Sequence, residues 1–168
     1  MRSFALLLAV LLLAGCGYHL PGRNNNLPPE VQTLYIELFG NRTAEPFLEN
    51  RITDRVTDRF ARTGALRLVE SRERADAALS GVVTSYTTAP ISYDRSDVIT
   101  EYRSIMTIAV TLRQMSDDRV LWKGDVEWSE EYPASLDKSA QEDNEAAAID
   151  VLSDRLSQEL YFRIMENF

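Results

Sequence analysis

The most regular pattern in the chain is found in residues 101–113, EYRSIMTIAVTLR. Its even-numbered residues, from Tyr102 to Leu112, form one mainly apolar row, whereas Arg103, Thr107 and Thr111 belong to the opposite row. Successive side chains of a strand point to opposite faces, whereas a helix would scatter these two classes around its circumference. The stretch is therefore predicted to be a strand with one buried face.

The segments on either side complete an antiparallel meander. Residues 77–89 are rich in β-forming side chains and end before Pro90, while residues 116–118 (SDD) form a tight turn. Beyond that turn, Val120, Trp122, Val126 and Trp128 alternate with charged residues. Three consecutive strands joined by turns predict a sheet with one covered and one relatively polar face.

Two helices are predicted to cover this sheet. The first follows a strand at residues 33–39 and a turn at 40–43, runs from Pro46 to about Thr63, stops at Gly64, and leads to a short strand at 66–70. The second begins at Asp137 or Ser139 and runs to Met165. Both carry apolar stripes at helical spacing, which are Leu48, Ile52, Val56 and Phe60 in the first, and Ile149, Leu152, Leu156, Leu160 and Ile164 in the second.

These elements predict an α+β fold with a single domain over residues 31–168. It is a two-layer sandwich in which two helices pack on a mixed sheet of four or five strands, three of which form the antiparallel meander. In the expected strand at 33–39, Leu34, Ile36 and Leu38 share one face and Phe39 lies on the other.

The N-terminal segment predicts a lipid anchor. Arg2 precedes an apolar run, residues 4–13, that is shorter than the roughly 20 residues needed to span a bilayer. This run suits a secretory signal, and Leu13-Ala14-Gly15-Cys16 has the form of a bacterial lipobox. We predict a signal peptide at 1–15, a lipid (palmitate among its acyl chains) on Cys16, and a tether over 16–30.

Composition argues against several classes of function. Removing Arg2 with the signal leaves 17 basic and 26 acidic side chains, the reverse of what a nucleic-acid-binding protein carries. The only histidine is His19, beside the tether, and the only cysteine is the predicted lipid site, Cys16. We therefore expect no activated nucleophile, no metal site and no cofactor, and predict that the protein is not an enzyme. A lipid-anchored enzyme that uses paired carboxylates is an alternative.

Four motifs, in order along the chain, resemble those of the lipopolysaccharide-assembly lipoproteins of the LptE family. They are Gly15-Cys16-Gly17-Tyr18-His19-Leu20, then Asn41-Arg42-Thr43 with Glu45-Pro46, then residues 100–107, and finally Glu142-Asp143-Asn144-Glu145.

The resemblance implies an outer-membrane lipoprotein that plugs the LptD β-barrel, assists its assembly, and binds lipopolysaccharide during transport to the outer leaflet. In such families, Gly17 after the lipidated cysteine favours the outer membrane. Another lipoprotein that assembles or activates an outer-membrane or cell-wall machine is the alternative.

The resemblance also points to residues that bind lipopolysaccharide. Arg95 matches a basic position that the family is thought to use, and Tyr93 lies beside it in the turn between the first two meander strands. At a second position where the family has a basic residue, this chain has Glu142. Lys138, one helical turn earlier, could substitute for the missing cation. Alternatively, Arg95 is a solvated turn residue paired with Asp94 or Asp97.

Overall fold

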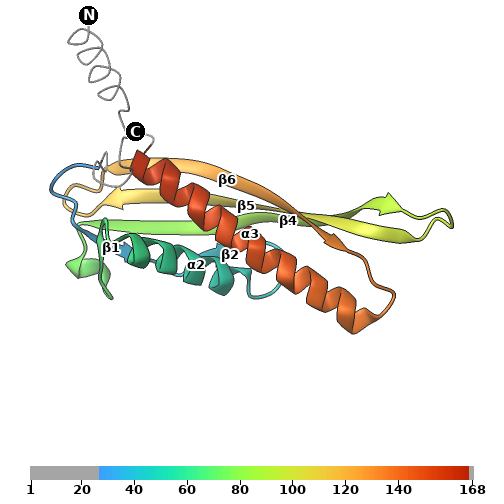
Figure 1. Cartoon of the computed structure of the whole chain (residues 1–168). Helices are drawn as coiled ribbons and strands as arrows, with labels where there is room; N and C mark the ends of the chain where they lie inside the picture. The colour runs from blue at the N-terminus through green and yellow to red at the C-terminus, as the bar shows by residue number, and fades with distance from the viewer. Residues whose placement is uncertain (1–26, 167–168) are drawn as a thin grey trace, which may run out of the picture.

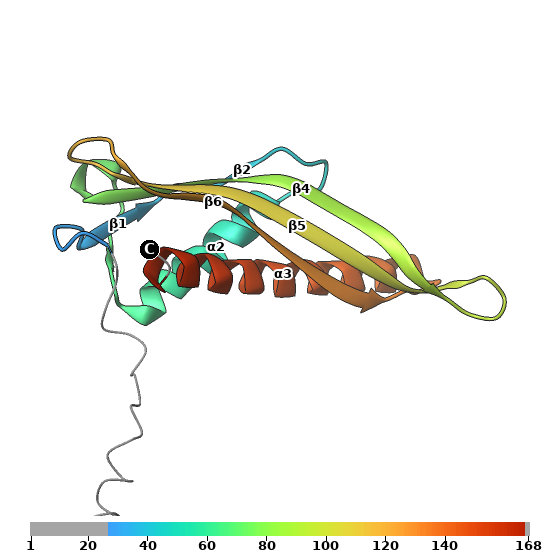
Figure 2. The ribbon, with the colours of Figure 1, turned by 90° about the horizontal axis from the view of Figure 1, so that it is seen from above.

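The computed structural model describes residues 27–166. Two helices, α2 (Leu48–Thr63) and α3 (Lys138–Glu166), pack on one face of a sheet, and the opposite face is open (Figure 2). The α+β two-layer architecture is therefore as predicted. None of the helices within these residues is both long and apolar enough to cross a membrane.

The sheet is mixed and has six strands. They are β1 (Thr33–Ile36), β2 (Gly40–Asn41), β3 (Arg67–Leu68), β4 (Ala77–Tyr93), β5 (Ile99–Gln114) and β6 (Val120–Pro133), and a short 3-10 helix, η1 (Arg72–Arg74), precedes β4. The strand order is β3-β1-β4-β5-β6. β2 also pairs with β4, at residues 82–83, just after the part of β4 that pairs with β1. The short strands run parallel to their neighbours, whereas β4, β5 and β6 form the predicted antiparallel meander.

The meander is longer than its sequence pattern indicates. β4 continues through Pro90 to Tyr93, and β6 continues to Pro133. Pro90 is tolerated because this part of β4 pairs only with β5, so the missing N–H faces no neighbouring strand. The β4–β5 hairpin consequently projects well beyond α2 (Figure 1).

The predicted strand at 33–39 ends early, at Ile36, and its last residues face the other way. Leu38, predicted to share a face with Leu34, is 65% exposed, whereas Leu34 is fully buried and Phe39, predicted on the opposite face, is only 2% exposed. The Phe39 N–H donates to Thr53 Oγ1 of α2 at 3.0 Å, which turns the ring into the core between β1 and β2. The backbone then rejoins the sheet as β2, where a turn was expected.

The predicted stripes of α2 and α3 meet the sheet and each other. All four α2 stripe residues are buried, as are the five of α3. Phe60 of α2 contacts Tyr161 of α3 edge to face, with ring centroids 5.1 Å apart. Helix α2 begins at Leu48, two residues later than predicted, because Phe47 adopts a left-handed conformation.

Candidate functional site

The two sequence-predicted binding regions lie at the same end of the molecule. Figure 1 shows the β4–β5 turn and the start of α3 on the right-hand side, and Figure 2 agrees. We call this region the distal end, defined by the β4–β5 turn (residues 94–98), the adjoining strand ends and the first turns of α3. The predicted lipid site, Cys16, lies outside the described residues.

The β4–β5 turn is held by Asp94. Its carboxylate accepts hydrogen bonds from the backbone N–H groups of Ser96 (2.7 Å) and Val98 (3.0 Å), and its own N–H donates to Val98 O. Asp97 takes a left-handed conformation, with φ of 58°. The carboxylate of Asp94 is therefore committed to the turn.

Arg95 and Tyr93 project from this turn into solvent. Arg95 is exposed and forms no ion pair with Asp94, Asp97 or any other residue within 27–166. Tyr93, the last residue of β4, is 55% exposed, and nearby Val98 is also exposed. This end of the hairpin thus presents a planar cation and an aromatic ring two residues apart, groups that can bind phosphate and apolar surface respectively.

Lys138 occupies a separate position at the start of α3. Its Nζ lies 3.6 Å from Glu142 Oε1, and both side chains are largely exposed. Such a pair contributes only about 0.3–0.5 kcal/mol to stability, so Lys138 can exchange Glu142 for another anion. No ion pair or hydrogen bond joins Lys138 to Tyr93 or Arg95 in the described part of the chain.

A polar cluster beneath the distal end was not predicted. The Tyr86 hydroxyl donates to Glu145 Oε1 at 2.8 Å and lies 3.1 Å from Ser104 Oγ. Thr88 Oγ1 lies 2.7 Å from Ser104 Oγ and 3.3 Å from Glu145 Oε1. The cluster therefore joins β4 and β5 to the first turns of α3. Ser104, a fully buried polar residue in an otherwise apolar row, was the sequence signal for it.

The electrostatics of this cluster favour a structural anchor. Burial raises the pKa of the Tyr86 hydroxyl, and the Glu145 carboxylate adds to the effect, so Tyr86 remains a protonated donor. Burial, followed by the negative charge of Glu145, also raises the pKa of Glu45 at the start of the α2 region. The Tyr132 hydroxyl is buried without a hydrogen-bond partner among the described residues, while its ring stacks on Tyr102 with centroids 5.7 Å apart.

Comparison with protein families gives one match that spans most of the chain. The family model described as "LptE: Lipopolysaccharide-assembly" matches residues 31–164. No curated protein matches the sequence.

Several solved structures share the fold, two of them structures of lipoproteins. Lipoprotein B of Nitrosomonas europaea has a TM-score of 0.60 at 14% identity, over 89% of this chain and 90% of that one. Rare lipoprotein B of Shewanella oneidensis has a TM-score of 0.55 at 12% identity, over 77% and 91%. A hypothetical protein of Chlamydia trachomatis gives 0.57 at 10% identity, over 80% and 95%.

Proposed function

Because this chain belongs to the LptE family of lipopolysaccharide-assembly proteins, we propose that it is a non-catalytic subunit of the LptD β-barrel translocon. In this role it plugs the barrel, helps the barrel assemble, and binds lipopolysaccharide on its way to the outer leaflet. The family match over residues 31–164 is the observation that carries the proposal.

The proposed location is the outer membrane, through a lipid on Cys16 after removal of residues 1–15. The tether then places the folded domain inside or beneath the barrel. In this arrangement the lipid provides the membrane attachment and the domain provides the contacts with LptD and lipopolysaccharide.

The open face of the sheet supports the role of a plug. Alongside β5 it carries exposed polar pairs, among them Arg103 with Glu131 (2.6 Å) and Thr107 with Glu127 (3.0 Å). The interiors of large outer-membrane barrels are polar, and some are filled by a plug. A long sheet with a charged face is suited to such a lumen because its charges stay hydrated or paired.

The distal end supports lipopolysaccharide binding. Arg95 has no intramolecular carboxylate partner among residues 27–166, so binding a phosphate would break no ion pair there. Tyr93 offers adjacent apolar surface for the lipid portion, and Lys138 offers a second, more distant cation.

The charge reversal Arg95→Glu tests this assignment. We expect weaker binding of the purified protein to lipopolysaccharide, by about tenfold or more, because a charge-assisted hydrogen bond is replaced by repulsion. The thermal midpoint and association with the barrel are expected to stay unchanged. Arg62→Glu, on an exposed part of α2, is the matched control. Equal binding by Arg95→Glu and wild type at low salt would place the lipopolysaccharide site elsewhere.

Affinity purification tests the larger proposal. The intact tagged lipoprotein, extracted from its own outer membrane, is expected to bring an LptD-type barrel with it. Recovery of a periplasmic cell-wall synthase or another secretion pore in its place would favour a different assembly machine.

A further inference from the structure

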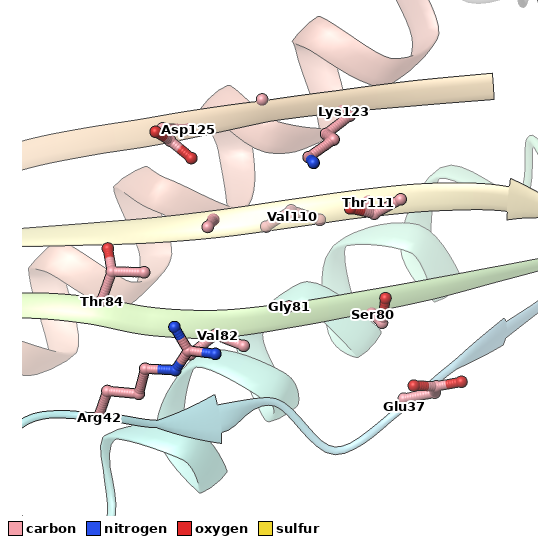
Figure 3. A pocket seen from close by; sticks show the side chains of 12 residues that line it. Glu37, Arg42, Ser80, Gly81, Val82, Thr84, Val110, Thr111, Lys123 and Asp125 are labelled. Atoms are coloured by element: carbon pink, nitrogen blue, oxygen red, sulfur yellow. The ribbon is translucent and has the colours of Figure 1, made fainter. Parts of the chain in front are cut away.

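A second candidate site lies on the open face of the sheet, opposite the helices. Here β4, β5 and β6, together with Glu37 and Arg42 on either side of β2, form a groove of about 660 Å³, shown with the helices behind the sheet in Figure 3. Small-molecule sites usually measure about 300–1,000 Å³, so the groove has a suitable size. Thr84 is the β4 residue of the groove that comes closest in sequence to the distal end. It lies nine residues before Tyr93, which corresponds to roughly 30 Å along a strand. The groove is therefore separate from the distal end.

One row of polar side chains crosses the groove on three neighbouring strands. Ser80 of β4 pairs with Thr111 of β5, which pairs in turn with Lys123 of β6. Directly opposed residues of neighbouring strands lie on the same face, with Cβ atoms about 4.5–5.5 Å apart. Neither hydroxyl of this row takes part in a hydrogen bond within residues 27–166, and Lys123 has no ion pair there. Two hydroxyls and an ammonium group are thus available side by side.

A second cation enters the groove from a braced loop. The Arg42 N–H donates to Val83 O at 3.0 Å, which fixes the backbone next to β4. On either side, Asn41 Nδ2 donates to Glu45 O at 2.7 Å, and the Thr43 N–H donates to Asn41 Oδ1 at 2.9 Å. The Arg42 guanidinium forms no ion pair with any described residue, and Figure 3 shows it turned toward the groove near Thr84. This loop contains the Asn-Arg-Thr motif, whose role the sequence alone did not explain.

The charges around the groove favour an anionic ligand. Two carboxylates line it, but Glu37 is already paired with Arg72 at 2.6 Å. This leaves Asp125 as the lining carboxylate without an ion pair among the described residues, against two unpaired cations, Arg42 and Lys123. In a chain with a net charge of −8, a groove lined by as many cations as carboxylates, with one of the carboxylates already paired to Arg72 outside the lining, is a distinguishing feature.

The other lining residues favour a small polar ligand over a protein. The anchors of protein–protein interfaces are enriched in tryptophan, tyrosine, methionine and arginine. No aromatic or methionine side chain lines this groove, whose middle row is Val82, Ala109 and Asp125. A floor of small side chains with acceptors and donors around it can accommodate a polyhydroxylated molecule.

We propose that this groove binds a phosphorylated saccharide. The phosphate lies over the row of Ser80, Thr111 and Lys123, while Asp125 accepts from the sugar hydroxyl groups and Arg42 donates to them or to a second anionic group. This site goes beyond the proposed role of the distal end and does not depend on it.

The test is a titration of the mature lipoprotein in detergent micelles, followed through the NMR signals of labelled alanine and threonine methyl groups. The probes are glucose 1-phosphate, inorganic phosphate and glucose. We expect glucose 1-phosphate to shift the signals of Ala109 and Thr111, while Ala148, a buried residue of α3 outside the groove, does not respond. Glucose alone is expected to produce no shift.

Two variants link the shifts to the groove. Lys123→Gln is expected to weaken binding of glucose 1-phosphate by about tenfold or more, and Arg42→Gln to weaken it to a smaller extent. Arg62→Gln on α2 is the matched control and is expected to bind like wild type. All three positions are exposed, and thermal melts verify that each variant is folded.

Three results would overturn the proposal. The first is that glucose 1-phosphate leaves the groove signals unchanged or binds equally to Lys123→Gln. The second is that inorganic phosphate shifts Thr111 as strongly as the sugar phosphate does, which would identify an anion site without a saccharide. The third combines two observations: wild type binds no sugar phosphate, and Lys123→Gln or Arg42→Gln no longer co-purifies with the barrel. Together they would identify the groove as a protein contact.

Discussion

A methyl group at Gly81 has no room in this fold. A Cβ built there would lie 2.5 Å from Cδ2 and 2.6 Å from Cζ of the Phe39 ring, closer than real carbon atoms approach. Phe39 is 2% exposed and its N–H is bonded to Thr53 Oγ1 of α2, so the ring cannot tilt away without disturbing the core between the sheet and α2. The φ of Gly81 is not positive, so any residue could adopt its backbone conformation. Glycine is therefore required here because of the close packing against Phe39.

We therefore expect Gly81→Ala to lower the free energy of unfolding by about 1–3 kcal/mol, the usual cost of forcing an extra carbon into a packed core. For a chain of this length, each kcal/mol lowers the thermal midpoint by roughly 2–4 °C. Urea and thermal unfolding of the purified protein, followed by circular dichroism, measure both quantities.

Two further variants test the reasoning. Gly40→Ala is the matched control, because a Cβ there would meet Val82 Cγ2 at an ordinary 3.5 Å, and its effect should stay within about 0.5 kcal/mol. Adding Phe39→Leu to Gly81→Ala should recover stability, so that the double variant is more stable than the sum of the two single changes predicts. Strict additivity, or a Gly81→Ala variant as stable as wild type, would refute the proposed clash.

Four other changes have defined outcomes. Asp76→Asn should lower the free energy of unfolding at neutral pH by about 1–2 kcal/mol, because the carboxylate accepts from the Thr33 hydroxyl at 2.7 Å and from two backbone N–H groups. The pKa of Asp76 is lowered mainly by the hydrogen bond from the Thr33 hydroxyl. The stability difference between wild type and Asp76→Asn should therefore shrink in urea titrations as the pH falls below 3.8, because Asp76 becomes protonated. A difference that stays constant with pH would contradict this assignment. Tyr86→Phe should cost about 1–2 kcal/mol, since its part-buried hydroxyl donates to a carboxylate. Tyr132→Phe should cost less, because that hydroxyl makes no hydrogen bond of normal geometry among the described residues; equal urea midpoints for the two variants would contradict this. Cys16→Ser should release the protein from the membrane fraction in cell fractionation without changing its thermal melt, and continued membrane association would rule out the lipid anchor.

The fold was predictable because its main elements have periodic patterns. The alternating row of β5 and the stripes of α2 and α3 each follow from burial of one face, and burial depends on the local sequence. The split between β1 and β2 was not predictable, because Leu38 and Phe39 are both large and apolar. Which of them is buried depends on Thr53 of α2 and on the space left by Gly81, and neither is local in sequence.

The candidate sites show the same division between local and distant causes. Arg95 and Tyr93 could be placed together because they are two residues apart at one end of the hairpin. The groove could not be predicted, because Ser80, Thr111 and Lys123 become neighbours only through the register of three strands. The pairing of Lys138 with Glu142 was within reach, since residues four apart on a helix are neighbours.

Helix α3 is attached to the sheet in two different ways along its length. Its C-terminal half buries Leu152, Leu156 and Leu160 completely, and each buried leucine contributes roughly 1.5–3 kcal/mol. Its first turns, in contrast, bury no side chain before Ala148 and are held by hydrogen bonds, among them those of Glu145 and that from Asn144 Nδ2 to Pro133 O. The start of α3 can therefore separate from the sheet at a lower cost than the rest of the helix, since local opening follows local stability.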